Sequence, residues 1–443
     1  MNQANSLKKV YVSDLWACIC MFMIVMLSAY VTQFSVLWFG VYILLAIPLL
    51  KSLEHYFCLC FLLSTIPYYF LGATAQIYSV YTILALMVLF SLLINGRTKM
   101  YWNRNSFLLS IGLMIIAVIS YRKSIFGYTN GMFQVIYIIA IPLFVCSLYQ
   151  MDLKVIARAL PQLATTMAIG YLLTVMITGG SFVGGRLTLP NDVNSNSFGT
   201  SCAQLATILF VSNYIRSHRS KLQLGVCLLV VVMALLSGSR GALLAFLAAA
   251  VIVVIIDAKR KNKLTTRVFG VLIVVGVLLV GLSVLISIFD LDAERFTLDA
   301  ILSLGESTRG VIYESVIPYV INNGLWIWGY GPGHDCSRQI VNQLTGWDFS
   351  HTHNTYIEAF GEMGIGGLIL TVVYSLKALF NINRVSKVSA EGYILLAVLL
   401  CMIIHGMAES FFCRISFWML LALCRSIQPD RHDLERTIST IGE

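Results

Sequence analysis

Apolar segments recur along most of the chain and are separated by short polar connections. They are about 16–25 residues long, the length that an α-helix needs to cross a hydrocarbon core of roughly 30 Å. The pattern predicts an all-α fold, a polytopic transmembrane helical bundle of about 12–14 spans. The fourteen candidate spans begin near Leu15, Val36, Tyr56, Gln76, Ser106, Met132, Val155, Phe198, Leu222, Ala242, Val268, Tyr356, Tyr393 and Phe411.

The longest stretch with sustained polarity lies between Asp290 and Asn354. It predicts one larger extracytoplasmic loop that contains short helices. We therefore expect transmembrane helices 1–11 in residues 1–289, the large extracytoplasmic loop in residues 290–355, and the C-terminal transmembrane helices with a cytoplasmic tail in residues 356–443.

Composition supports a membrane protein and excludes a nucleic-acid partner. Of the 443 residues, 58% are hydrophobic and 12% are charged, whereas roughly a quarter of the residues in a soluble domain are charged. The net charge is +9, but the basic residues are spread over short loops and do not form the stripe that binds nucleic acid. We expect a multi-pass protein of the inner (plasma) membrane.

The distribution of Lys and Arg predicts the orientation. With a cytoplasmic N-terminus, every second connection should carry the basic residues. All but eight of the 30 Lys and Arg residues fall on that side, which predicts that both termini are cytoplasmic. The eight on the outer side are Arg122, Lys123, Arg186, Arg240, Arg295, Arg309, Arg338 and Arg414.

An outer basic residue works against the insertion bias, so each needs a reason of its own. The ordinary reason is a side chain that snorkels to the interface or pairs with a nearby acid. We expect snorkelling for Arg122 and Lys123. Arg414 follows Glu409 by five positions, so the two side chains are expected to pair.

The first outer segment with candidate chemistry is Ser237–Gly241, a short break between two very apolar runs. It is too short to leave the membrane surface, so Arg240 is held at the outer interface among small residues. Small neighbours would let an anionic ligand approach the guanidinium and the backbone amides closely. Snorkelling alone would also explain the arginine.

The second segment is Glu306–Tyr313 in the large loop. Thr308 is expected to cap a helix that runs towards Pro318, which places Arg309 in the first turn. Arginine suits a helix N-terminus poorly because the macrodipole favours anions there. An anion bound between Arg309 and the helix start would remove this conflict; the alternative is an ion pair with Glu306.

The third segment, Phe349–Glu358, is where the polar loop meets the next span. Thr355 and Glu358 have capping-box spacing, which favours a structural role for Glu358. His353 then precedes the helix start, where positive potential favours the neutral imidazole, and such a group can accept a proton from a hydroxyl. A hydrogen-bonded surface histidine is the ordinary alternative, and His351 is a rival for the same role.

Two outer stretches are rich in glycine: Gly184–Leu187, followed by Asn194 and Asn196, and Gly329–Gly333. They lack the spacing of a dinucleotide fingerprint. They are typical of turns, and the amide side chains would also suit sugar hydroxyls. The chain has no Walker A sequence, no HExxH and no outward Asp-x-Asp pair, so a reaction here needs an already activated donor.

These residues together resemble the O-antigen ligase and polymerase family of polytopic bacterial glycan enzymes. The resemblance covers roughly residues 180–375. It is carried by the Arg-x3-Leu element from Arg240 to Leu244, by Arg309, and by His353-Asn354, which nine residues separate from Gly364-Ile365-Gly366-Gly367. The Gly329–Gly333 turn and the Gly-Arg-Leu…Asn-x-Asn stretch also resemble the family.

The resemblance implies a membrane glycosyltransferase that moves a glycan from an undecaprenyl diphosphate carrier to a hydroxyl acceptor, with no cofactor and no metal. The residues fit this chemistry, because two arginines can stabilise a diphosphate leaving group and a histidine can deprotonate the attacking hydroxyl. The expected catalytic residues are His353, Arg309 and Arg240. The expected substrate-binding residues are Arg186, Asn194, Asn196, His351 and Asn354.

Within the family we favour a polymerase of O-antigen, capsule or exopolysaccharide units. Its partners would be the undecaprenyl-diphosphate-linked oligosaccharide donor and acceptor and membrane lipids, with a chain-length regulator and a flippase as candidate protein partners. The alternatives are an O-antigen ligase that transfers glycan to lipid A-core, or transfer to a protein. A flippase for the same lipid-linked sugars is the alternative of another class, and would be expected to place polar residues near the midplane of broken helices.

Overall fold

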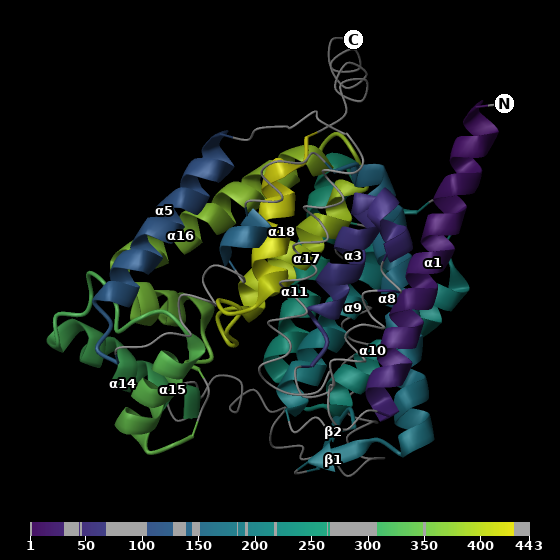
Figure 1. The fold of residues 1–443 in the computed structure, drawn as a ribbon. Helices are drawn as coiled ribbons and strands as arrows, with labels where there is room; N and C mark the ends of the chain where they lie inside the picture. Colours follow the sequence, from purple (N-terminus) through teal and green to yellow (C-terminus); the bar gives the residue numbers. More distant parts are fainter. Residues whose placement is uncertain are drawn as a thin grey trace.

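The computed structural model of the protein is a mainly helical assembly (Figure 1). The structure describes residues 2–30, 44, 47–67, 104–126, 139–143, 151–183, 185–190, 194–216, 219–263, 265, 308–348 and 351–428. The helices of these parts are α1 (Asn2–Tyr30), η1 (Ile47–Lys51), α3 (Leu53–Leu63), α5 (Arg104–Arg122), α8 (Leu153–Thr178), α9 (Ser195–Ile215), α10 (Lys221–Leu236), α11 (Arg240–Arg260), α14 (Thr308–Asn322), α15 (His334–Thr345), α16 (Thr355–Ser386), α17 (Gly392–His405) and α18 (Ile415–Ser426).

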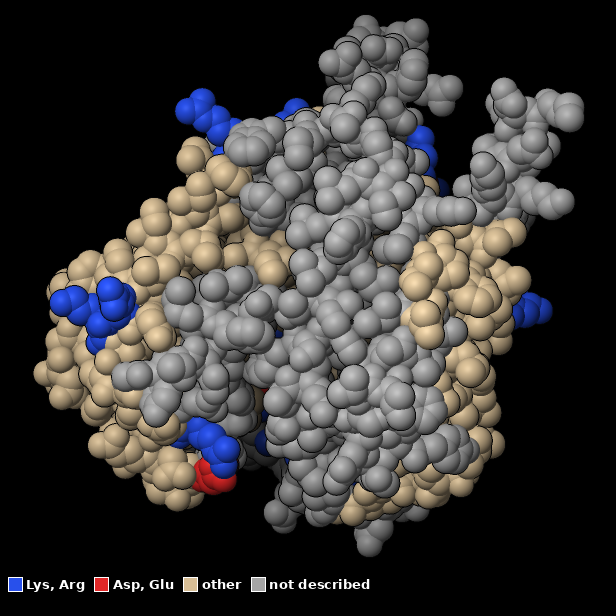
Figure 2. Space-filling model, viewed as in Figure 1, with Lys and Arg blue, Asp and Glu red and all other residues tan. Residues whose placement is uncertain are grey.

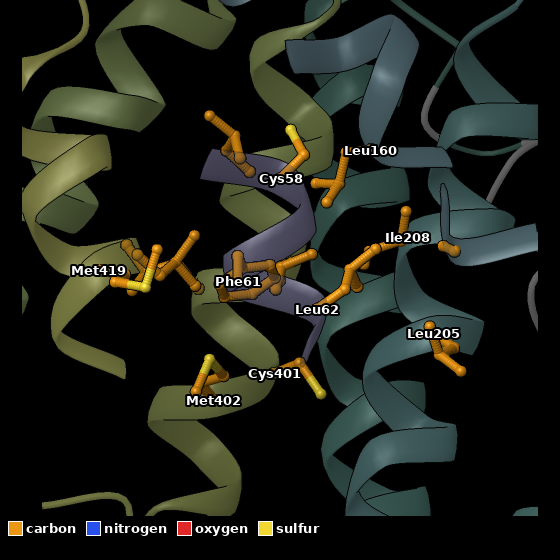
Figure 3. Packing of buried hydrophobic residues seen from close by; sticks show 14 of the residues in the cluster. Cys58, Phe61, Leu62, Leu160, Leu205, Ile208, Cys401, Met402 and Met419 are labelled. Atoms are coloured by element: carbon orange, nitrogen blue, oxygen red, sulfur yellow. The ribbon is translucent and has the colours of Figure 1, made fainter. Parts of the chain in front are cut away.

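The middle of the bundle is occupied by α3, and all eleven of its residues are buried. Figure 3 shows Phe61 of α3 facing Met419 of α18, and Leu62 on the side of Ile208 in α9. A helix that is apolar on every face must be surrounded by other helices. This burial explains how a helix too short to cross a membrane belongs to the core of the bundle.

Around α3, the packing of the long helices is consistent with a membrane protein. Among the described residues, α8, α11 and α16 are long and apolar enough to cross a bilayer, and six shorter apolar helices accompany them. Large apolar side chains such as Leu222, Leu244 and Phe380 point outwards, as expected of surfaces that face lipid. Figure 2 shows a described surface that is mostly uncharged, with Lys and Arg towards its edges.

Ten of the fourteen predicted spans have a helix at their position: α1, α3, α5, α8, α9, α10, α11, α16, α17 and α18. The spans predicted to begin near Val36, Gln76, Met132 and Val268 lie wholly or mostly outside the described residues. The large loop predicted at 290–355 does contain helices, since α14 and α15 lie within it.

A second, smaller core forms where α14 and α15 pack together. Ile312, Val316 and Ile340 are fully buried there, and Ile357 and Phe360 from the start of α16 pack against the same cluster. The first turns of α16 therefore belong to this lobe, while its later turns pack against α17 and α18.

Helix α16 is broken at Gly364, whose backbone is not helical (φ 65°, ψ −164°). The amide groups near the break find partners in the loop after α14: Ile365 N donates to Trp326 O at 2.8 Å, and Tyr330 N donates to Gly361 O at 2.8 Å. A side chain at 364 would meet Ile327 O at 2.2 Å. Glycine is required here both by the positive φ and by this close approach.

The break lies near one end of α16, so about 22 residues follow it, enough to rise about 33 Å. That length crosses a bilayer. Trp326 and Trp328 lie half exposed beside the break, as tryptophans often do at a membrane interface. A flippase was expected to place polar residues near the midplane of broken helices; the break in α16 lies close to one end of the helix.

A two-stranded antiparallel sheet departs from the all-α expectation. β1 (Ser181–Val183) and β2 (Arg186–Thr188) form a hairpin between α8 and α9. Its glycine-rich turn was correctly read as a turn, but three-residue strands are too short to leave a periodic signal. The hairpin and the α14–α15 lobe lie towards the end of the molecule opposite the start of α1 (Figure 1).

Candidate functional site

Four basic side chains surround the carboxylate of Glu409, which is 2% exposed and lies in the loop between α17 and α18. His351 Nε2 is 3.1 Å from Oε1 and His353 Nδ1 is 3.6 Å from Oε2. Arg414 Nη2 is 3.5 Å from Oε1, and Arg309 Nη2 is 3.9 Å from Oε2. We call these five residues the Glu409 cluster.

The two histidines come from the short segment before α16, and their rings lie 4.3 Å apart between centroids. His353 has a positive φ of 55°, a conformation that is uncommon for a residue other than glycine. Its carbonyl accepts a hydrogen bond of 3.0 Å from the hydroxyl of Tyr313. Tyr313 and Arg309 are four positions apart on α14, so the same helix face holds the His353 backbone and supplies a guanidinium.

The start of α16 differs from the predicted capping box. Asn354 is the cap, and its Oδ1 accepts hydrogen bonds from Tyr356 N and Ile357 N at 2.9 and 3.1 Å. Glu358 does not fold back to the helix start; its carboxylate is buried and bonded to Ser410. The capping-box interpretation of Glu358 is wrong, because Asn354 is the cap and Thr355 N, the amide that Glu358 would accept from, donates to Gly406 O at 2.8 Å.

Electrostatics in the Glu409 cluster favour a charged carboxylate next to a neutral His351. Burial alone would raise the pKa of Glu409, but the hydrogen bonds and charges of His351 and His353 outweigh it and hold that pKa well below its ordinary value. Burial lowers the pKa of His351, and the nearby charge of His353 adds to this effect. The guanidinium groups of Arg309 and Arg414 add positive charge beside the same carboxylate.

Arg309 lies where the sequence predicted it, in the first turn of α14. The helix continues through Pro318 rather than ending there. Glu306, the predicted alternative partner, lies outside the described residues. The acid that faces Arg309 in the structure is Glu409, one hundred positions further along the chain.

Arg240 begins α11, directly after the buried collar Ser237–Ser239. The small residues of this collar are used for packing: a side chain at Gly199 of α9 would meet Ser237 Oγ and Ser239 Cβ at 2.3 Å. On the side that α9 covers, the collar residues therefore pack against a helix, while the approach of an anionic ligand to Arg240 stays a prediction. Arg240 itself is half-buried at the helix start.

Arg186 and the two asparagines bind one another and the collar. Arg186 Nε donates to Ser237 O at 2.7 Å, and its Nη2 donates to Asn196 Oδ1 at 2.6 Å. Asn194 caps α9 by accepting from Asn196 N and Ser197 N. These contacts give Arg186, Asn194 and Asn196 a structural explanation, while their binding to substrate stays a prediction.

Two contacts connect the hairpin side to the Glu409 cluster. Arg414 Nη2 lies 3.5 Å from Ser197 Oγ, next to the asparagine that holds Arg186. The start of α11 packs against the segment before Glu409, since a side chain at Gly241 would lie 3.3 Å from Ala408 Cβ. The structure thus brings His351, His353, Arg309 and Asn354 together directly, with Arg186, Asn194, Asn196 and Arg240 in the adjoining region.

Sequence reasoning missed the residue at the centre. Glu409 was considered only as an ion-pair partner for Arg414, and that pairing is confirmed at 3.5 Å. The signal was an isolated acid and an isolated arginine on the same outer loop. Their connection to the histidines could not be read from the sequence, because His351 and Glu409 are 58 positions apart.

Two groups of side chains in the described residues have ligand atoms close enough for a metal ion: His351, His353 and Glu409, and separately Glu358, Glu362 and Cys413. In the first group, two permanent cations approach the same carboxylate and would repel a divalent ion. In the second, Glu362 already accepts hydrogen bonds from Gly333 N and Ser337 Oγ at 2.9 and 2.8 Å. Neither arrangement favours a metal.

Comparison with known families gives the arrangement a context. Residues 225–372 match the family model described as O-antigen ligase. Over this segment the chain is similar to the O-antigen ligase family. The segment includes Arg240, Arg309, His351 and His353, whereas Glu409 lies beyond its end. No curated protein matches the chain significantly.

The family resemblance predicted from the sequence is thereby confirmed. An O-antigen ligase family segment in a chain with long apolar helices supports an integral membrane protein that acts in glycan transfer. It also implies lipid-linked glycan substrates.

Proposed function

We propose that this O-antigen ligase family protein is a bacterial cell-surface polysaccharide polymerase. It transfers a growing glycan from undecaprenyl diphosphate to a sugar hydroxyl of a lipid-linked repeat unit, without a metal and with inversion at the anomeric carbon. The observation that carries the proposal is the convergence of Arg309, Arg414 and two histidines on one buried carboxylate.

The arginines supply the charge that the departing diphosphate needs. Arg309 and Arg414 approach Glu409 from two different elements, α14 and the loop before α18. As the bond between the anomeric carbon and the diphosphate breaks, the leaving oxygen gains negative charge. Fixed guanidinium groups stabilise that charge without reorganisation, as a metal ion would in a metal-dependent enzyme. Arg240, at the adjoining start of α11, is the third candidate for this task.

His353 is the proposed general base. Its Nδ1 faces Glu409 at 3.6 Å, so the proton of the acceptor hydroxyl passes to Nε2. The hydroxyl oxygen forms a bond to the anomeric carbon, and the diphosphate leaves from the opposite face with the electron pair of the broken bond. Attack from one face and departure from the other inverts the configuration.

The ligase alternative has one observation in its favour, because the matching family model is described as O-antigen ligase. The same chemistry would then transfer a finished glycan to lipid A-core. The acceptor is the difference between the two reactions, and the Glu409 cluster serves either one equally well.

Deletion of the encoding gene followed by gel analysis of surface glycan separates the possibilities. Loss of a polymerase leaves single repeat units on their acceptor. Loss of a ligase leaves long chains stranded on the carrier lipid, and loss of a flippase traps the unit on the cytoplasmic leaflet. The polymerase proposal fails if the deletion strain still makes surface chains of normal length.

Complementation with variants then tests the site. Arg240→Ala, Arg309→Ala and His353→Ala should restore no polymer although the protein is inserted in the membrane. Arg338→Ala is the matched control, since Arg338 is an exposed arginine of the same lobe whose guanidinium pairs with the exposed Asp348. Normal chains from all three site variants would show that the site is wrongly assigned.

A further inference from the structure

Glu409 has a geometry that neither packing nor simple charge neutralisation explains. Its side chain is 2% exposed, and burying a carboxylate is unfavourable unless it is well paired. Yet both arginines stay at 3.5 and 3.9 Å, longer than the 2.7–2.9 Å of a charge-assisted hydrogen bond. Basic side chains surround the carboxylate, but neither arginine is close enough for a short charge-assisted hydrogen bond.

An ion pair of the same lobe shows what close pairing looks like in this protein. Arg338 Nε and Nη2 donate to the two oxygens of Asp348 at 2.8 and 2.7 Å, although both residues are exposed. That guanidinium is matched bidentately by its acid. By contrast, among the residues that the structure describes, Arg309 and Arg414 share the carboxylate of Glu409, so two positive charges face one negative charge.

The backbone around Glu409 fixes where the carboxylate stands. Glu409 O accepts a hydrogen bond from Thr355 Oγ1 at 3.1 Å, and the same hydroxyl accepts one from Phe411 N at 2.8 Å. Next to it, Ser410 is bonded to Glu358 of α16. The loop is thereby tied to the start of α16, directly after His353. These hydrogen bonds fix the backbone that carries Glu409 relative to the helix start that follows His353.

We propose that Glu409 is a positioning residue with two tasks. It orients His353 through the ring nitrogen Nδ1, and in the resting enzyme it occupies the place between Arg309 and Arg414 that a diphosphate takes when substrate binds. This inference rests on the proposed function, because it assumes that the arginines bind a diphosphate. The excess of positive charge over the single carboxylate leaves the site attractive to an anion of higher charge.

The two tasks predict opposite effects from one substitution. Glu409→Gln keeps the size of the side chain but removes its negative charge. The arginines then lose their internal competitor, so inorganic pyrophosphate should bind more tightly. At the same time His353 loses its orienting carboxylate, so glycan formation should fall. A merely structural acid would weaken both properties together.

The experiment measures both properties on the full chain. Binding of inorganic pyrophosphate to the detergent-purified protein is titrated by calorimetry, and polymer is assayed by gel in the complemented deletion strain. For Glu409→Gln we expect a Kd lower by roughly 5- to 100-fold, the usual range of coupling between two ligands of one site. Polymer should fall by about 10²-fold or more, the scale of general-base catalysis.

Two further variants keep the outcome interpretable. Glu409→Asp retains the charge on a shorter side chain, so it should return the Kd towards that of the wild type and restore part of the polymer. Glu314→Gln makes the same charge change at an exposed position of α14 and should alter neither property. Thermal unfolding of each purified variant shows how much of the protein is folded.

The results separate this inference from the proposed function. The inference is wrong if wild type binds pyrophosphate and Arg309→Ala makes no polymer, but Glu409→Gln binds pyrophosphate no more tightly or makes normal polymer. The proposed function is wrong if wild type binds no pyrophosphate and Arg309→Ala makes polymer as usual.

Discussion

The arginines on the two sides of the site are used in different ways. Arg186 in the hairpin donates two short hydrogen bonds, at 2.7 and 2.6 Å, to a carbonyl and an amide of its own chain. Arg309 in the α14 lobe lies 3.9 Å from a carboxylate that it shares with another arginine. Both were predicted as ligand-binding residues. In the structure the first is held by acceptors of its own chain, whereas the second faces a shared carboxylate; ligand binding by either residue stays a prediction.

This difference follows from the neighbours and not from the residue type. A guanidinium that donates short hydrogen bonds to two acceptors of its own chain stabilises the fold, so its removal lowers stability. A guanidinium facing a shared anion keeps donors for a second anion. A substitution of Arg186 should therefore lower stability more than activity, and a substitution of Arg309 should lower activity more than stability.

Arg309→Ala should give the largest effect on activity. Loss of one group that stabilises charge in a transition state lowers rates by about 10²–10³-fold, and polymer formed by isolated membranes should fall accordingly. Arg309→Lys should recover part of the loss, because it restores the charge without the planar fork. If instead the variant unfolds several degrees earlier and its polymer falls only in proportion to the loss of folded protein, Arg309 has a structural role like that of Arg186.

Arg186→Ala should act mainly on stability. Hydrogen bonds to a charged group contribute about 1.5–3 kcal/mol each, so the purified variant should unfold at a clearly lower temperature. Polymer per folded molecule should stay close to the wild-type level. If thermal unfolding is unchanged while polymer disappears, Arg186 contacts substrate and the contrast between the two sides fails.

Gly199→Ala tests how closely α9 packs on the collar Ser237–Ser239, which also accepts a hydrogen bond from Arg186. The added methyl group would lie 2.3 Å from Ser239 Cβ, and overpacking of this kind lowers stability by about 1–3 kcal/mol. Gly225→Ala on α10 is the matched control, since no atom lies within 4 Å of a methyl group there. It should be neutral or stabilise by up to about 1 kcal/mol. Equal melting temperatures for the two variants would show that α9 does not pack on the collar this closely.

The smallest expected effect is the change of the melting temperature with pH. Burial lowers the pKa of His351 in the folded protein, whereas an unfolded histidine titrates near about 6.5. As pH falls through that value the unfolded chain binds the proton first, so stability decreases. The melting temperature of the wild type should therefore fall between pH 7.5 and 5.5, and His351→Gln should fall less.

Glu409 does not interfere with that measurement. Its lowered pKa stabilises the fold at every pH above about 4.3, the value of an unfolded glutamate, and the benefit is lost only below it. A melting temperature that falls equally steeply in wild type and His351→Gln would contradict the proposed environment of His351.

Much of the fold was predictable because it depends on local patterns. Apolar runs of membrane length gave helices at ten predicted positions, and Thr308 and His353 lie at the helix starts where the sequence put them. The hairpin and the break at Gly364 were not predicted. Three-residue strands and a single kinked residue leave too little periodicity to recognise.

The candidate site was predicted only in part, for a related reason. The sequence selected Arg309 and His353 because an arginine or a histidine is conspicuous at the outer end of an apolar chain. It assigned Arg186 to substrate on the same ground, although its acceptors lie 51 and 10 positions away and were not recognisable as partners. Residue type identifies candidate site residues, but the partners of each side chain decide whether it stabilises the fold or can bind a ligand.

The sequence by itself determined the membrane class and the helical spacing, since each depends on composition within a window of one helix, and it predicted a set of outward basic residues. Only the tertiary structure decided that Glu409 stands among them and that Arg414 reaches Ser197 across 217 positions. Such contacts depend on how helices pack, and packing is selected by the shape of buried surfaces contributed by many distant residues at once.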